Sequence, residues 1–326
     1  MTKNLPVKNT EFNVKAFLSA VLSDRTIAHR AMVAGLPIAQ FKSIEEVFVA
    51  AGLAEVTKVR EGTAWTQVNL TLASHYHAYE ALVFGVLLDT VENWLSEGSL
   101  EAFFFMHKPP GLRLRFKSSE NANQVDIVSL VDQLINSGAA KEYTFGIYEP
   151  EMYLFGGPVG IDLAHSFFTA DSLFVLRHFR RCISGDALLS PDIASLVMLD
   201  RMLVAVLGDS WEAWDVWMRV HYMRGTAKIS KSLFDDVQNI LEFAGHTSPL
   251  DVASLVLPEL VDLEARVESI GQRALQAITK GQLLSGIRSL LPFWVVFHWN
   301  RMGFGLNMQQ NLAAVMAQLR QPGVNT

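Results

Sequence analysis

The sequence contains few of the residues that build disulfides or thiolate metal sites. Cys182 is the single cysteine in 326 residues, which excludes an internal disulfide and a zinc site made of paired thiolates. No uncharged apolar run reaches the roughly 18 residues that suggest a membrane helix, and the N-terminus lacks the apolar segment of a signal peptide. We therefore expect a soluble protein of the reducing cytoplasm that does not enter a membrane.

Basic charge and cofactor motifs are also scarce. The formal net charge is −6, which argues against nucleic acid as a general partner. Two short helices within residues 14–56 lack a basic recognition face, so we interpret them as a packing or docking module and not as a DNA-binding unit. The sequence has no GxGxxG after a strand, no Walker sequence, no HExxH and no GxSxG. We expect no organic cofactor and no metal.

Half of the residues are hydrophobic, which is enough for a sizeable core. Alternating and helical apolar spacing predicts an α+β chain, with a small, mostly antiparallel sheet in the N-terminal half and a large helical C-terminal part. We predict two domains, an N-terminal helical module over 1–60 and a catalytic domain over 61–326. The expected strands cover residues 64–72, 101–107, 112–117 and 141–148, and almost everything after Pro158 is expected to be helical.

The expected strand "LRLRFK" carries two arginines two residues apart. Side chains alternate between the faces of a strand, so Arg113 and Arg115 point the same way while the leucines point the other way. Two cations aimed at one small region indicate an anion site. The later segment "YEPEMYLFGGP" places Glu149 and Glu151 after the next strand. A structural salt-bridge cluster between these carboxylates and the arginines is an equally open interpretation.

A third group of residues lies in "PFWVVFHWNRMGFG". On a helix, Trp294, His298 and Arg301 fall at i, i+4 and i+7 and share one face. A histidine between tryptophans is more often a packed core residue than a catalyst, but a buried arginine needs a partner. Asp171 and Ser172 are expected to form a local hydrogen-bond brace, although a Ser-His-Asp nucleophile set stays open.

Together, "FFFMHKPPGLRLRF", "YEPEMYLFGGPVGIDLAHSFFTADS" and "FHWNRMG" resemble the thiopeptide-type bacteriocin biosynthesis family, which is homologous to the C-terminal elimination domain of lantibiotic dehydratases. The resemblance runs from about Trp65 to the C-terminus. It implies an enzyme that matures a ribosomal precursor peptide with a leader segment, working beside other maturation enzymes of its pathway, with a homodimer as one expected assembly.

The resemblance implies two reactions. Elimination domains expel glutamate from glutamylated serine or threonine, whereas thiopeptide pyridine synthases join two dehydroalanines by an aza-[4+2] cycloaddition and then expel water and the leader. The usual elimination arginine and histidine are replaced here by Leu154 and Val296. We therefore expect the cycloaddition, with glutamate elimination and a non-catalytic peptide-binding partner as alternatives.

Carrying the family pattern across gives the expected site, which we predict to line a deep, partly polar cavity between the arginine strand and the helix 294–301. The expected catalytic residues are Arg113, Arg115, Glu151, His298 and Arg301, and the expected substrate-binding residues are Tyr148, Glu149, Trp294 and Asn300.

Overall fold

The computed structural model describes residues 13–73, 77–119, 125–225, 229–246 and 256–323. The chain divides into two compact units, residues 1–57 and 58–326. Helix α3 (Ile38–Ala64) runs through this division and also contains the domain boundary predicted at residue 60.

The first unit contains α1 (Val14–Val21), α2 (Ile27–Ala34) and the start of α3. Its small core is formed by Phe17, Ala20, Ala31, Ala34 and Phe41. The prediction of only short helices here is wrong, because α3 extends over 27 residues. A single glycine, Gly52, interrupts the apolar pattern, but one glycine costs a helix only about 1 kcal/mol and does not end it.

A four-stranded antiparallel sheet opens the second unit, in the order β2-β3-β1-β4. Each strand lies within two residues of its predicted range. The bounds are Trp65–Leu72 for β1, Leu100–Lys108 for β2, Gly111–Ser118 for β3 and Ala140–Gly146 for β4.

The two faces of this sheet differ in chemistry. On one face Leu112, Leu114 and Phe116 are at most 1% exposed. This face packs against α4 (His77–Ser96), whose Phe84 and Trp94 contact phenylalanine rings of β2 and β3. The other face carries the side chains at alternate positions, including both arginines of β3. The alternation in "LRLRFK" therefore separates an apolar face from a cationic one.

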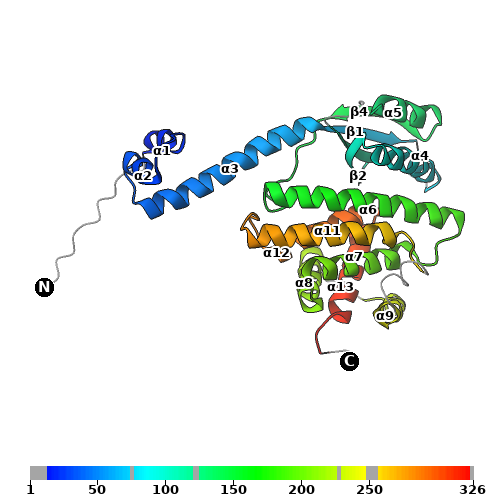
Figure 1. The fold of residues 1–326 in the computed structure, drawn as a ribbon. Helices are drawn as coiled ribbons and strands as arrows, with labels where there is room; N and C mark the ends of the chain where they lie inside the picture. The colour runs from blue at the N-terminus through cyan, green and yellow to red at the C-terminus, as the bar shows by residue number, and fades with distance from the viewer. Residues whose placement is uncertain (1–12, 74–76, 120–124, 226–228, 247–255, 324–326) are drawn as a thin grey trace. The chain divides into compact units, whose positions relative to one another are not determined.

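The helical part contains one central helix, α6 (Pro158–Ser184), which runs beneath the sheet between it and the helices that follow α6 in the chain (Figure 1). Gly157 precedes it with φ 93°, a conformation that favours glycine. By length and composition α6 could cross a membrane, but 83% of its apolar window is buried inside the protein, as in a core helix. The other helices are α5 (Ile127–Asn136), α7 (Pro191–Leu207), α8 (Ser210–Arg224), α9 (Lys231–His246), α11 (Leu260–Thr279), α12 (Ile287–Arg301) and α13 (Leu306–Leu319).

The predicted fold class is confirmed. The small antiparallel sheet lies in the N-terminal half of the sequence, and helices follow it to the end of the described residues.

Candidate functional site

A row of three cations crosses one face of the sheet. Arg113, Arg115 and Lys117 alternate along β3 and share its polar face. Opposite them on β1, in the same order, stand Asn69, Gln67 and Trp65. We call the three β3 side chains the cationic row.

Arg115 is the most firmly held member of the row. Its guanidinium carbon lies 5.0 Å from the ring centroid of Phe104 and 4.5 Å from that of Tyr148, within the range of cation–π attraction. Its Nε donates a hydrogen bond of 2.9 Å to the side chain of Gln67. Burial lowers the pKa of Arg115, the nearby Tyr148 opposes this shift, and the positive charge of Arg113 reinforces it. The guanidinium is thus fixed in place and remains able to meet an anion.

Arg113 is partly buried, and no residue that the structure describes forms a hydrogen bond or an ion pair with it. Glu149 and Glu151 are exposed, and among the described residues neither forms an ion pair with an arginine of the row. The alternative of a structural salt-bridge cluster at this place is therefore wrong. Both arginines of the row are without a carboxylate partner within the described chain.

A neutral histidine lies beside the row. His165 of α6 forms a 2.8 Å hydrogen bond through Nε2 with the hydroxyl of Tyr148, and its ring centroid lies 4.7 Å from that of Trp65. Burial, reinforced by the positive charges of Lys117 and Arg115, lowers the pKa of His165 to about 3. At neutral pH the imidazole is therefore uncharged.

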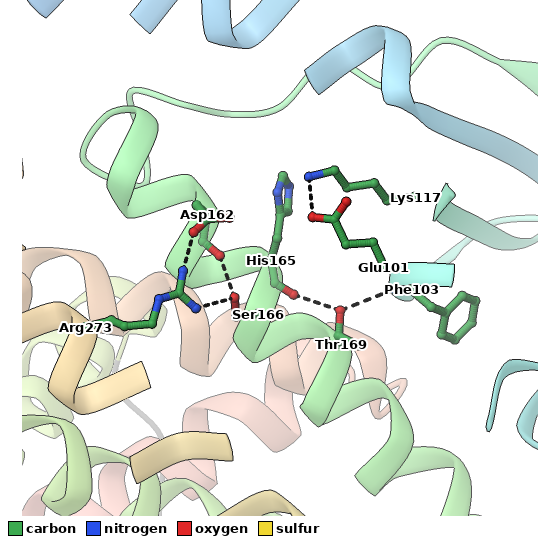
Figure 2. Close-up of polar contacts among 8 residues, drawn as sticks. All are labelled: Glu101, Phe103, Lys117, Asp162, His165, Ser166, Thr169 and Arg273. Carbon is green, nitrogen blue, oxygen red and sulfur yellow. Dashed lines mark hydrogen bonds and ion pairs between the residues drawn. The ribbon is translucent and has the colours of Figure 1, made fainter. Parts of the chain in front are cut away.

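A cavity of about 1050 Å³ opens at the Lys117 end of the row. Strands of the sheet, α6 and α11 form its walls, and His165 lines it from α6. Figure 2 shows the His165 ring pointing toward the end of the Lys117 side chain. The lining residues are Trp65, Glu101, Ala102, Lys117, Asp162, His165, Ser166, Thr169, Val261, Asp262, Ala265, Arg266, Ser269, Ile270 and Arg273.

Ion pairs stand at both sides of this cavity (Figure 2). On the sheet side, Nζ of Lys117 donates to Oε1 of Glu101 over 2.8 Å. On the helix side, Arg273 of α11 pairs with Asp162 and donates a 3.0 Å hydrogen bond to Oγ of Ser166. The cavity therefore offers donors and acceptors on opposite walls, with aromatic and aliphatic surface between them, as binding sites for amide-containing ligands commonly do.

A second cluster of polar side chains lies in the core, away from this cavity. Nδ1 of His298 lies 2.6 Å from Oδ1 of Asp171, and its Nε2 lies 2.8 Å from Oγ of Ser195. Trp299 donates to the same serine oxygen over 3.2 Å. The cluster also includes Arg301, which forms an ion pair with Asp171. We call these five residues the closed cluster, because each of their side chains is fully buried.

Arg301 joins three elements of the fold. Its Nε donates 3.0 Å to the carbonyl oxygen of Phe105 in β2, and its guanidinium carbon lies 5.0 Å from the ring centroid of Phe168 in α6. Burial lowers the pKa of Arg301, and the charge and hydrogen bond of Asp171 oppose this shift. The arginine therefore fastens α12 to the sheet and to the central helix.

The structure separates the residues that the sequence placed in one site. Arg113 and Arg115 lie on the polar face of the sheet beside Tyr148, and the charges of Glu151 and Arg301 both act on Arg115. None of these residues lines the cavity, and neither does His298, which like Arg301 is fully buried. The expected cavity between β3 and the helix 294–301 is therefore corrected to one between the sheet, α6 and α11.

The other α12 residues are also packed. Trp294 is 1% exposed and stacks on Phe167 with centroids 4.9 Å apart. The side chain of Asn300 accepts a 3.1 Å hydrogen bond from Gln309. The roles predicted for these residues and for the catalytic set stay predictions.

Asp171 is not the local brace that the sequence suggested. Its two partners, His298 and Arg301, are 127 and 130 positions away in the chain, and Oγ of Ser172 is buried without a hydrogen bond. Sequence reasoning also missed Lys117, although it continues the alternation of the two arginines. His165 falls one turn from Asp162 and Thr169 on α6, a spacing that marks a shared helix face.

Metal ligation finds no support in the described part of the chain, where no three His, Cys, Asp or Glu side chains are grouped to hold an ion. The site consists of cations, some of them paired with carboxylates, together with aromatic rings and one neutral imidazole.

The sequence profile of the lantibiotic biosynthesis dehydratase C-terminal family matches residues 65–321. The chain belongs to this family. The match covers the sheet, the cationic row, the cavity and the closed cluster, and it confirms the resemblance inferred from the three motifs. No curated protein sequence gives a significant match.

Two solved structures are similar to this chain at low identity. The tRNA-dependent lantibiotic dehydratase MibB from Microbispora sp. 107891 aligns with a TM-score of 0.61 and 16% identity, over 79% of this chain and 28% of MibB. The chain thus shares its fold with part of MibB, and it corresponds to little more than a quarter of the length of MibB. TsrL aligns with a TM-score of 0.47 and 15% identity, over 78% of this chain and 94% of TsrL.

Proposed function

We propose that this chain matures a ribosomal precursor peptide that carries dehydroamino acids, and that it joins two dehydroalanines by an aza-[4+2] cycloaddition to form a pyridine. Water and the leader peptide, as an amide, leave after ring formation. Membership of the lantibiotic biosynthesis dehydratase C-terminal family supports peptide maturation. The observation that carries the proposal is the roomy cavity beside a cationic row whose two arginines have no carboxylate partner in the described chain.

The cavity suits a reaction that depends mainly on holding two parts of one chain together. Two dehydroalanines and the backbone around them need a volume of several hundred Å³, and the cavity offers about 1050 Å³. Bringing two reacting groups into contact can supply about 7–11 kcal/mol of a barrier. A rigid wall of α6 and the sheet provides such positioning.

The cations beside the cavity suit an amide oxygen that gains negative charge during the reaction. The amide next to one dehydroalanine must react as its imidic acid tautomer, so negative charge builds up on the amide oxygen as its N–H proton leaves. Arg115 and Lys117 are cations fixed at one side of His165. We assign the stabilisation of this oxygen to the whole cationic row, Arg113 included, and we assign His165, held neutral, a hydrogen-bonding role toward the peptide.

The structure offers less to glutamate elimination. Position 154 carries a partly buried leucine, and Val296 is 6% exposed, so neither position carries an ionisable group. The nearest histidine on α12, His298, is fully buried, and both of its ring nitrogens are engaged with Asp171 and Ser195. A base acting from this helix would first have to leave the closed cluster.

Glutamate elimination remains a second candidate because of Arg113. Two guanidinium groups on one strand face match the geometry of a departing carboxylate, and Arg113 has no other partner among the described residues. A non-catalytic peptide-binding role is the third alternative.

The test compares two synthetic peptides by mass spectrometry, each behind the leader of a precursor encoded beside the gene of this chain. One peptide carries two dehydroalanines and the other carries a glutamylated serine. We expect the first to lose water and the leader amide and the second to stay unchanged. Release of glutamate from the second would instead establish elimination, and binding without any mass change would establish the non-catalytic role.

The matched variants for this assay are Arg113→Ala and Arg180→Ala. Arg113 has no partner in the described fold, whereas Arg180 is an exposed arginine of α6 that pairs with Asp89. We expect Arg113→Ala to lower kcat/KM about 100-fold, a typical effect of removing one charge-stabilising donor, and Arg180→Ala to change it less than about threefold. Equal activity of the wild type and Arg113→Ala would remove the arginine from the site.

A further inference from the structure

The two edges of the sheet, β2 and β4, differ in how their outward backbone groups are bonded. At the β2 edge, the backbone N–H of Phe103 donates to Oγ1 of Thr169, and the carbonyl of Phe105 accepts from Arg301. Side chains from α6 and α12 therefore occupy the backbone groups that would otherwise pair with another strand. Proteins commonly protect sheet edges in this way.

The register shows which backbone groups of β4 face outward. In an antiparallel sheet, each residue directs both its N–H and its C=O to the same neighbour, and successive residues alternate between neighbours. The backbone groups of Phe103 and Phe105 face the outer edge of β2, so those of Phe104 face Arg115 of β3. By the same alternation, the backbone groups of Leu114 in β3 face Val68 of β1, and those of Asn69 in β1 face Thr144 of β4. Thr144 then bonds to β1, and its neighbours Tyr143 and Phe145 turn their backbone groups outward.

This outer edge is uncovered in the described part of the chain. No described strand pairs with it, and no described side chain bonds to the outward backbone groups of Tyr143 and Phe145. Phe145 stands in register with the fully buried Val68 and Leu114, yet it is 52% exposed, and Ile147 is 85% exposed. The apolar face of the sheet therefore continues to β4 but lacks its last covering side chains.

We propose that the β4 edge binds an extended segment of the precursor peptide as a fifth strand, with an apolar residue of that segment lying over Phe145. This inference rests on the proposed function, since that function supplies a peptide substrate. An extended chain is the partner that a bare strand edge accepts through its backbone. Thr144, Asn69 and Arg113 are neighbours across β4, β1 and β3, and they connect this edge with the cationic row.

The geometry fixes how the bound segment relates to the reacting residues. The added strand would lie three strand spacings from β3, about 14 Å at 4.8 Å each. An extended chain covers about 3.3 Å per residue, so at least about five residues must separate the docked segment from the residues that react at the cationic row. A docking segment upstream of the reacting residues, such as part of the leader, meets this requirement.

The decisive variants are Phe145→Pro and Phe145→Thr, which both remove the ring. Proline also removes the outward N–H, and proline is tolerated on edge strands whose N–H faces solvent. The probe is the unreacted, fluorescein-labelled precursor peptide encoded beside the gene of this chain, titrated by fluorescence anisotropy. We expect Phe145→Pro to raise Kd at least tenfold and Phe145→Thr to raise it no more than about threefold.

Amide hydrogen exchange on the wild type gives a second measurement that does not depend on a folded variant. Peptide binding should slow exchange at Tyr143 and Phe145 and leave Thr144, already bonded to β1, unchanged. Equal losses of affinity in the two variants, protection only at other elements, or no binding of the probe would each overturn the proposal.

Size-exclusion chromatography with light scattering tests whether the edge instead binds a second copy of this chain. A dimer of the wild type that dissociates in Phe145→Pro would assign the edge to a second copy of this chain and overturn the peptide as its partner. Because the probe is unreacted, its binding at β4 is measured separately from turnover. Binding at β4 with no turnover of the dehydroalanine peptide would contradict the proposed reaction alone, and turnover of that peptide without β4 protection would contradict the docking alone.

Discussion

The cationic row and the closed cluster set arginine among the same kinds of residue in opposite circumstances. Histidine and aromatic rings belong to the closed cluster, and they lie beside the cationic row as His165, Tyr148 and Phe104. In the closed cluster Arg301 has a carboxylate partner in Asp171 and no exposed surface. In the cationic row Arg113 has no carboxylate partner among the described residues and stays partly exposed. The presence or absence of a carboxylate partner, and not the residue type, therefore distinguishes a structural arginine from one that is available to a ligand.

The physical reason is the cost of removing charge from water. A fully buried ion is stable only when an opposite charge and hydrogen bonds replace its lost hydration. A cation left at a surface without a carboxylate remains hydrated, and it can exchange that water for an anionic or partly charged ligand atom. Variants of the two regions should therefore fail in different assays.

The largest expected effect is on stability, at Arg301. Arg301→Met leaves the Asp171 carboxylate buried without its ion pair, so we expect the free energy of unfolding to fall by about 3–5 kcal/mol. Urea unfolding followed by circular dichroism measures this change. Arg113→Ala, which breaks no ion pair in the described fold, should change it by less than about 0.5 kcal/mol. Similar losses in the two variants would erase the distinction between the regions.

A smaller loss is expected at Ser195, whose hydroxyl contacts both His298 and Trp299. Ser195→Ala leaves two buried ring nitrogens without that partner, at a cost of about 1–3 kcal/mol. The same unfolding measurement tests it. Ser285→Ala, at an exposed serine without a hydrogen bond to a described residue, is the matched control and should be neutral. A neutral Ser195→Ala would show that the cluster tolerates unpaired nitrogens.

The smallest expected effect is a pH dependence at His165. Its pKa of about 3 in the folded protein lies below the value of about 6.5 in an unfolded chain. Between these values the unfolded chain binds a proton that the folded protein does not, so stability falls as the pH falls. We expect the wild type to lose about 1 kcal/mol more stability than His165→Gln between pH 6.5 and pH 5.5.

Urea unfolding of both proteins at several pH values measures this difference. Parallel stability profiles would mean that His165 takes up its proton in the folded protein near the usual pKa, so that part of the imidazole population would be charged near neutral pH.

Local patterns were sufficient for most of the fold. The alternation of "LRLRFK" placed the two faces of β3 correctly because strand side chains alternate regardless of what surrounds them. The predicted sharing of one face by Trp294, His298 and Arg301 was also sound, since all three contact residues of α6. Periodicity identified the elements and their faces.

Those patterns could not predict which residues far apart in the sequence contact each other in the folded protein. Whether His298 faces a cavity or Asp171 depends on how α6 packs on α12, and the two residues are 127 positions apart. The same limit applies to the cavity, whose wall on α11 was assigned no role from the sequence because Arg273 lies in an ordinary amphipathic helix. Long-range neighbours decide which of several plausible charged residues meet a ligand.

The hydroxyl of Thr169 couples two parts of the molecule through one atom. Its oxygen accepts from the amide of Phe103 and donates 2.9 Å to the carbonyl of His165, so the outer edge of β2 and a turn of α6 share it. The residues that can replace Thr169 are consequently limited by the need for a hydroxyl group rather than by the shape of the side chain. Serine keeps the shared atom, whereas valine, which matches threonine in outline, lacks it and would loosen the histidine from the strand beside it.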